Sequence, residues 1–242
     1  MKRILNILLI PFSIFVLTAC EIFHLDNYDG PNASFYGGIK DAETGELVET
    51  DIQNGSAIRA YELGWPTEAA LTWVIKQNGE FRNDMAFAAH YKIEFINCNF
   101  FPFTIEDLEI KSGDNQHDFQ ATPYIRINNI NIRKEGNSIV ATFNLQAGKP
   151  EVKLSAIRLY AFTDIYVGEQ VKFETQGTNS RQTFSPAKEI DNTTYTLRIE
   201  LDENTNLFKY NRNYYFRVGA LASVSNVGTV RYNYAPLVVI PL

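Results

Sequence analysis

Apolar residues occupy alternate positions in short segments along most of this 242-residue chain. A repeat of two residues is that of a β-strand with one buried face, because successive side chains point to opposite sides of the strand. No long segment shows a helical repeat, and the chain holds 17 Phe and 13 Tyr, residue types that favour strands. The clearest apolar face consists of Phe87, Ala89, Tyr91, Ile93 and Phe95. The sequence therefore predicts an all-β fold after residue 32.

Residues 33–120 are predicted to form a first β-sandwich domain. Asn78-Gly79 is a strong hairpin signal, since both residue types tolerate the positive φ angles of a tight turn. Short strands separated by such turn residues are typical of a sandwich. The expected strands are residues 33–39, 56–63, 71–75, 87–95 and 107–111.

Residues 121–242 are predicted to form a second β-sandwich domain. Pro123 interrupts the preceding pattern and marks a boundary between the two domains. The nearly all-apolar segment from Ala235 to Ile240 predicts a final strand that is buried on both faces. Earlier strands are expected at residues 139–145, 157–161, 194–201 and 213–220.

The first 19 residues have the pattern of a secretory signal peptide. Lys2 and Arg3 precede an apolar run that is too short to span a membrane as a helix. The run ends in Leu17-Thr18-Ala19-Cys20, which resembles a bacterial lipobox. The resemblance implies cleavage before Cys20, a lipid on its sulfur, and a lipidated tether over residues 20–32. The alternative is an ordinary signal peptide with an incidental cysteine.

Charge and cysteine content exclude several classes of function. Removing the two signal-peptide cations from 22 Lys and Arg leaves 20, against 28 Asp and Glu, a net charge of −8. This charge does not suit a nucleic acid as partner. After lipidation of Cys20, Cys98 is the one remaining cysteine of two, so no internal disulfide and no cysteine-based metal site can form. We expect Cys98 to be a buried, inert thiol.

Two short motif sets resemble known sandwich families. Gly38-Ile39-Lys40-Asp41, Gly79-x-Phe81 and Tyr91-x-Ile93 resemble the transthyretin-like (prealbumin-like) domain, although Ala89 replaces the family's usual glycine. Residues 213–220 resemble the penultimate strand of fibronectin type III and immunoglobulin-like domains. The second resemblance implies that Tyr214 is a corner tyrosine with a buried ring and a hydroxyl bonded to nearby backbone.

The order of these features resembles one family along the whole mature chain. Residues 26–31 precede the transthyretin-like domain, and Asp118-Phe119-Gln120-x-x-Pro123-Tyr124 leads into the immunoglobulin-like domain. This arrangement resembles the Bacteroidota surface lipoproteins of the domain-of-unknown-function 3823 type. Such proteins accompany outer-membrane glycan-uptake machinery of the starch-utilisation type. The resemblance implies a lipid-anchored outer-membrane protein, exposed at the cell surface, that binds or presents glycans.

Signatures of catalysis and of metal binding are weak. The sequence has no phosphate-binding glycine loop, no His-Glu-x-x-His and no Gly-x-Ser-x-Gly. His117-Asp118 could be half of a catalytic triad, but a solvated loop is the favoured interpretation, and Glu106-Asp107 is expected on any acidic surface. Two oxygen-rich loops, Asp41-x-Glu43 with Glu46 and residues 202–206, are more typical of turn chemistry than of calcium binding. We therefore expect no enzymatic activity, no cofactor and no metal.

Aromatic residues outside the expected core are the candidates for glycan binding, because sugar rings stack their C–H faces on flat aromatic rings. Tyr61 and Trp65 lie in a segment where Gly64 and Pro66 indicate a loop. Trp65 is interpreted either as a ligand platform or as interdomain packing, since exposed aromatics mark both kinds of interface. Tyr166 and Tyr232 are further candidates. The alternative is that they are exposed side chains of edge strands without a binding role. Trp73 alternates with apolar neighbours and is expected in the core.

The leading hypothesis is a non-catalytic surface lipoprotein that binds an oligo- or polysaccharide or assists a polysaccharide-uptake complex. The alternative is a structural or adaptor lipoprotein that docks to an outer-membrane transporter or a fimbrial partner without binding sugar. One feature that could support this alternative is the apolar run Phe100-Phe101-Pro102-Phe103. We expect this apolar run to be buried, whereas an exposed run would be a protein docking site.

Overall fold

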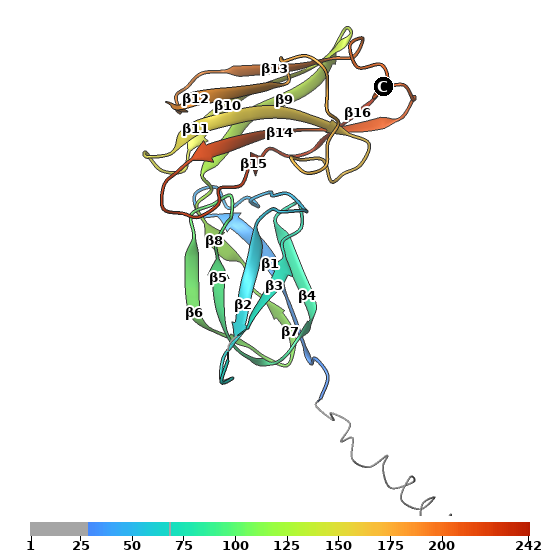
Figure 1. Ribbon diagram of the computed structural model, residues 1–242. Helices are drawn as coiled ribbons and strands as arrows, with labels where there is room; N and C mark the ends of the chain where they lie inside the picture. Colours follow the sequence, from blue (N-terminus) through green and yellow to red (C-terminus); the bar gives the residue numbers. More distant parts are fainter. Residues whose placement is uncertain (1–28, 68) are drawn as a thin grey trace, which may run out of the picture.

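The computed structural model describes residues 29–67 and 69–242, which form two β-sandwiches, with one end of the first against a face of the second (Figure 1). The predictions for residues 1–28, including the signal peptide and lipidation of Cys20, lie outside these residues. No helix that could cross a membrane occurs in the described part of the chain. The prediction of an all-β fold built from sandwiches is confirmed.

The first sandwich packs two sheets against each other. β1 is the centre of one sheet, where it pairs antiparallel with β4 and parallel with β7 and β8. This sheet contains β1 (Ala33–Asp41), β4 (Glu80–Ala86), β7 (Gly113–Gln116) and β8 (Phe119–Ala121). The other sheet has the order β3 (Ala70–Val74), β2 (Ala57–Glu62), β5 (Ala89–Phe95) and β6 (Phe103–Ile110).

Aromatic side chains fill the space between these two sheets. The ring centroid of Phe35 on β1 lies 5.6 Å from that of Trp73 on β3, which is 8% exposed, so the prediction that Trp73 is a core residue is confirmed. The Asn78-Gly79 turn also forms, with Gly79 at φ 86°. It closes a short hairpin, in which Ile75 and Phe81 form an antiparallel bridge, and carries the chain from β3 in one sheet to β4 in the other.

The second sandwich has the same two-sheet plan and a continuous apolar core. One sheet has the order β13 (Tyr195–Glu200), β10 (Ser138–Ala147) and β9 (Ile125–Glu135). The other contains β12 (Arg181–Glu189), β11 (Lys153–Phe162), β14 (Asn213–Ser223), β15 (Asn233–Tyr234) and β16 (Val238–Pro241).

β14 is the central strand of the larger sheet and pairs with β11, β15 and β16. Tyr214 on this strand is fully buried and its hydroxyl donates to the carbonyl oxygen of Tyr210 at 3.0 Å, which confirms the predicted corner tyrosine. The expectation for the C-terminal strand is wrong. Val239 is 46% exposed, because β16 pairs with β14 alone and covers the edge of the sheet.

The two ends of the first sandwich have different surroundings. β1 begins at the end far from the second sandwich, where the described chain starts, and ends at Asp41 against the second sandwich (Figure 1). The apolar run from Phe100 to Phe103 lies at the junction between the sandwiches. Phe100 is 1% exposed, and the Phe101 ring packs on that of Tyr124 with centroids 4.9 Å apart. Phe101 therefore packs against the second sandwich, whereas Phe100 and Phe103 pack in the core of the first, and the run does not form an exposed apolar patch.

Candidate functional site

A fully buried guanidinium joins the two sandwiches. Arg217, near the middle of β14, donates to the carboxylate Oε2 of Glu49 at 2.6 Å and to the carbonyl oxygen of Thr50 at 3.0 Å, both in the first sandwich. Its Nε donates to the carbonyl oxygen of Ala235 at 3.1 Å. The ring of Tyr234 lies 4.1 Å from the guanidinium carbon, in the geometry of a cation–π contact. One side chain of the second sandwich thus satisfies several acceptors of the first.

Burial shifts the pKa values of both partners in this pair. Loss of water lowers the pKa of Arg217 and raises the pKa of Glu49, in each case against the attraction of the opposite charge. Both shifts disfavour the charged forms, so each charge depends on the other for its stability. Removal of one partner from such a pair leaves a buried charge without compensation.

A second ion pair crosses the junction on another side. The guanidinium of Arg126 at the start of β9 contacts both carboxylate oxygens of Asp41, at 2.5 and 2.8 Å, and lies 2.8 Å from a Glu43 oxygen. Burial opposes ionisation of Asp41, but the hydrogen bonds and charge of Arg126 outweigh it and lower the pKa of this carboxyl. The predicted turn chemistry is also present, since Glu43 N donates to Asp41 Oδ1 at 3.0 Å.

Two buried asparagines complete the polar junction. Asn99 donates to the carbonyl oxygens of Glu49, at 2.6 Å, and Tyr232, at 3.1 Å, so it bridges the sandwiches. Asn233 donates to the carbonyl oxygen of Asn99 at 2.7 Å and accepts from Ile125 N at 3.0 Å. Because these buried groups satisfy one another, the junction has a defined geometry and can hold a binding surface in place.

A hollow of about 470 Å³ opens on the surface beside this junction, and we call it the junction groove. Residues of both sandwiches line it, so its shape depends on their relative placement. The lining side chains are Glu49, Ile52, Lys76, Gln77, Asn78 and Glu80 from the first sandwich and Ile165, Tyr166 and Leu237 from the second.

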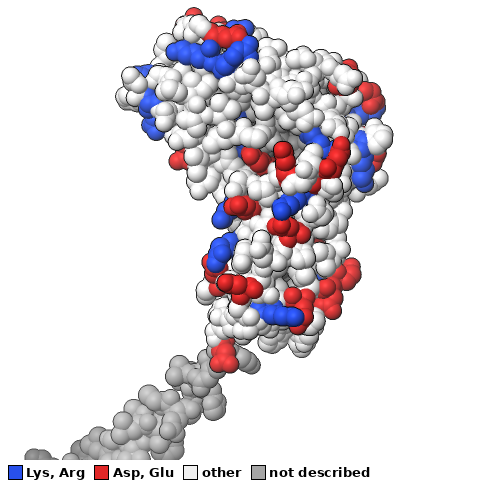
Figure 2. All heavy atoms as spheres, turned by 180° about the vertical axis from the view of Figure 1, so that it is seen from behind, with Lys and Arg blue, Asp and Glu red and all other residues white. Residues whose placement is uncertain are grey.

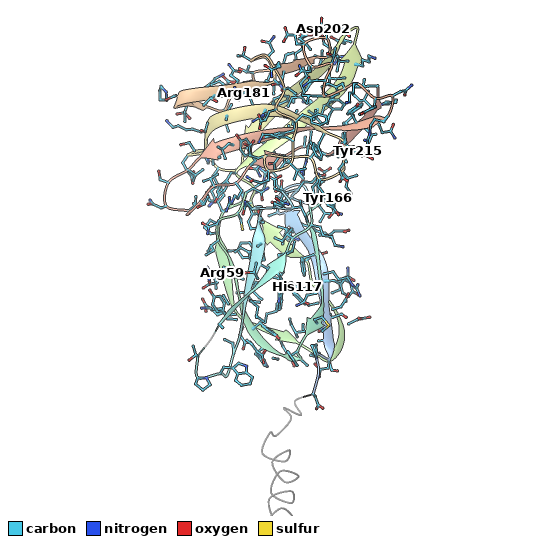
Figure 3. The ribbon with its side chains drawn as sticks, turned by 45° about the vertical axis from the view of Figure 1, so that its right-hand side comes forward. Arg59, His117, Tyr166, Arg181, Asp202 and Tyr215 are labelled. Carbon is cyan, nitrogen blue, oxygen red and sulfur yellow. The ribbon has the colours of Figure 1, made fainter. Side chains whose placement is uncertain are left out.

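Tyr166 presents its ring at the junction groove from the loop between β11 and β12 (Figure 3). Its side chain is 45% exposed, although the next residue, Val167, is completely buried. Asp164 accepts the Tyr166 N–H at 3.1 Å and fixes the turn. Gly168 allows the close approach of Asp51, because a Cβ there would lie 1.9 Å from Asp51 Oδ1. The loop backbone is thus held on the first sandwich while the Tyr166 ring remains free.

Polar side chains surround this ring on the first sandwich. Gln77 Nε2 donates to the carbonyl oxygen of Val167 at 3.4 Å, and Asn78 Nδ2 donates to Glu80 Oε2 at 3.0 Å. Lys76 and Glu80 are exposed at the same groove. An exposed aromatic face beside amides and charged groups is suited to a ligand with apolar faces and many hydroxyls, since each part of such a ligand finds a partner.

The four predicted glycan-binding residues do not form one site. Tyr232 is half-buried and meets Tyr160 edge to face, with centroids 6.1 Å apart, so it contributes to packing near the junction. Tyr61 and Trp65 lie at the opposite end of the first sandwich, where the Tyr61 hydroxyl donates to Glu94 at 2.8 Å. Trp65 is 56% exposed, which contradicts its interpretation as interdomain packing.

The histidine and acidic candidates have other partners. His90 Nδ1 lies 2.6 Å from Asp107, which raises the pKa of the exposed imidazole. Asp118 pairs with Lys40 at 2.7 Å and accepts the Gly38 N–H at 2.9 Å. No group of three or more potential metal-ligating side chains occurs within residues 29–67 and 69–242.

Family comparisons cover both sandwiches. Residues 33–122 match the family model described as the N-terminal domain of a protein of unknown function, DUF3823. Residues 125–238 match the model described as domain of unknown function DUF3823_C. A comparison with curated proteins finds no match.

Solved structures share this architecture. A crystal structure of a protein from Bacteroides uniformis ATCC 8492, provisionally described as carbohydrate binding, is 52% identical with a TM-score of 0.85, covering 88% of this chain and 100% of that one. A DUF3823 family protein from Parabacteroides merdae ATCC 43184 is 20% identical with a TM-score of 0.69, covering 88% and 100%. Another, from Bacteroides uniformis ATCC 8492, is 18% identical with a TM-score of 0.72 and the same coverage. The two DUF3823 family structures, at 20% and 18% identity, show only that the fold is shared.

Proposed function

The chain belongs to the DUF3823 family, and from this premise we propose that it is a non-catalytic surface protein that binds glycan in the junction groove. The relative with 52% identity, provisionally described as carbohydrate binding, supports this class of ligand. The observation that carries the proposal is the exposed ring of Tyr166 above a groove rich in polar groups.

The chemistry of the junction groove fits a sugar. A pyranose ring presents a patch of C–H groups that packs on a flat aromatic face, here that of Tyr166. Its hydroxyls need hydrogen-bonding partners at the edge of the patch, and the side chains of Gln77, Asn78 and Glu80 provide them. The groove is open to solvent, so a sugar bound there can be part of a longer chain.

We further propose that Cys20 carries a lipid that anchors the protein in the outer membrane, with the described residues exposed at the cell surface. The lipobox-like Leu17-Thr18-Ala19-Cys20 supports this anchor. The described chain starts at the end of the first sandwich that lies opposite the junction, so the anchor places the groove at the end remote from the membrane. In this position the protein would present glycan to an outer-membrane uptake complex.

The test is retention of purified protein, residues 21–242, by a panel of polysaccharides. We expect one glycan class to retain the wild-type protein and Tyr166→Ala to lose retention. Trp65→Ala is the matched control, because Trp65 is a similarly exposed aromatic at the far end of the first sandwich. Retention that survives Tyr166→Ala and disappears in Trp65→Ala would move the site to Trp65. Absence of retention across the panel would contradict the proposed function.

A further inference from the structure

Three large apolar side chains are exposed at the end of the first sandwich that lies opposite the junction. Met85 is 69% exposed, Trp65 is 56% exposed and Phe87 is 41% exposed. We call these three residues the tether-end patch. None of them lines the junction groove, and the glycan-binding proposal does not use them.

Backbone hydrogen bonds bring the three side chains to the place where the chain enters the fold. Asn32, the residue before β1, donates its N–H to the carbonyl oxygen of Ala86 at 3.1 Å, and its side chain accepts the N–H of Ala88 at 2.8 Å. Met85 and Phe87 flank Ala86 and are therefore beside the start of β1. Both residues thus lie at the end of the fold where the tether begins.

The loop that carries Trp65 lies at the same end. Glu62, the last residue of β2, pairs with Tyr91, and the Tyr91 hydroxyl donates to the carbonyl oxygen of Phe87 at 3.0 Å. The Trp65 indole N–H donates to Glu62 Oε1 at 3.0 Å. This bond fixes the polar edge of the indole on the protein while more than half of the side chain stays in solvent. Trp65 thus adds to the apolar surface that Met85 and Phe87 expose at the same end, and exposed apolar patches mark interaction sites.

We propose that the tether-end patch lies in the surface layer of the membrane that holds the anchor, and this inference rests on the proposed anchor at Cys20. Twelve peptide units separate Cys20 from Asn32, so the anchored end of the sandwich can stand no more than roughly 40 Å from the lipid. The chain therefore keeps the patch within this distance of the lipid. Trp side chains favour the boundary between headgroups and acyl chains, where the ring is in apolar surroundings and the N–H keeps a polar partner, which for Trp65 is Glu62.

Charge around the patch selects the kind of membrane surface. Glu62, Asp84, Asp107 and Glu109 lie on the strands that reach this end, where Arg82 pairs with Asp84. Figure 2 shows more Asp and Glu than Lys and Arg over the lower part of the first sandwich. Like charges repel, so we expect contact with zwitterionic lipid to be stronger than contact with anionic lipid. This contact would fix the orientation of the junction groove toward the exterior.

The test uses residues 20–242 coupled through the Cys20 thiol to a maleimide-headgroup lipid in phosphatidylcholine vesicles with brominated acyl chains. Cys98 does not compete for the maleimide, because it is 1% exposed and burial raises its pKa to about 11. The chain has two tryptophans, and Trp73 is buried. Bromine quenches an indole only at contact range, so a loss of emission reports Trp65 in the bilayer.

We expect bromine to quench the emission of the wild-type chain and this quenching to be lost in Trp65→Phe. The variant Met85→Ser/Phe87→Ser should show weaker quenching, because it keeps Trp65 but removes apolar contacts with the bilayer. Replacing a fraction of the phosphatidylcholine with phosphatidylserine should also weaken the quenching of the wild-type chain. Equal emission from vesicles with and without bromine would overturn the proposal, and a concentration-dependent dimer would then assign the patch to a second copy. Because the coupling is chemical, this result is independent of lipidation in the cell and of glycan binding by residues 21–242.

Discussion

Arg217 is the residue on which the relation between the two sandwiches depends most. Its position in an apolar, alternating strand gave no sign of its role, since a single Arg in such a strand reads as a solvent-facing residue. The strand is covered on both sides, by the core and by the first sandwich, so the guanidinium is buried. Its acceptors come from residues 49, 50, 77, 167 and 235, which no local pattern connects.

Replacing Arg217 with Met should destabilise the protein by about 3–5 kcal/mol, because Glu49 then retains a buried charge without its partner. The free energy of unfolding from urea titration measures this cost. The double variant Arg217→Met/Glu49→Gln is the control, and we expect it to recover part of the loss. A single variant as stable as the wild type would show that the pair does not hold the junction.

The Cys98 thiol should be inert in the folded protein. It is 1% exposed and its pKa is about 11, so both access and thiolate formation are suppressed at neutral pH. With residues 21–242, where Cys98 is the only cysteine, a thiol reagent at pH 8 should react quickly in guanidinium chloride and very slowly without it. Rapid stoichiometric labelling of the native protein would disprove the burial described here.

At the scale of elements, alternation predicted the strands with one clearly buried face. Tyr91, Ile93 and Phe95 on β5 are buried as expected, and so are Ile139 and Phe143 on β10. Phe87 was expected on the same face as Tyr91, but it precedes β5 and is 41% exposed. Alternation did not predict strands that lack such a face. β7 (Gly113–Gln116) has no apolar residue, and it becomes a strand because β1 offers it a parallel edge. Pairing with a distant strand is a tertiary effect that local sequence does not contain.

Tyr214→Phe tests the corner of β14. The ring stays buried but its hydroxyl no longer donates to the carbonyl oxygen of Tyr210, so the free energy of unfolding should fall by about 1 kcal/mol. Tyr215→Phe is the matched control, since Tyr215 follows on the same strand with a half-buried side chain (Figure 3). Equal effects of the two substitutions in chemical denaturation would contradict a special role for the corner tyrosine.

At the scale of the whole molecule, the junction groove is assembled from segments about 90 to 190 positions apart in sequence, which explains why it could be predicted only in part. Tyr166 was predicted as a candidate because it is an aromatic residue outside the expected core. Gln77 and Leu237 were missed, because they carry no local signal and meet Tyr166 only after both sandwiches are in place. Trp65 had the stronger local signal but lies far from them.

The Asp41–Arg126 pair should make stability depend on pH in acid. The pKa of Asp41 is lowered below its ordinary value of 3.8, so the pair contributes stability above this value that is lost as pH falls through the folded-state pKa. The difference in free energy of unfolding between the wild type and Asp41→Asn should therefore shrink as pH drops below about 4. A difference that stays constant from neutral to acid pH would exclude this linkage.

The most direct test of the central claim is a calorimetric titration with an oligosaccharide of the class that retains the protein in the panel. Wild-type protein should bind it with a measurable Kd, and Tyr166→Ala should weaken binding by about tenfold, since loss of one aromatic contact costs about 1.4 kcal/mol. Trp65→Ala should leave the Kd unchanged. An unchanged Kd in Tyr166→Ala would show that the junction groove is not the glycan site.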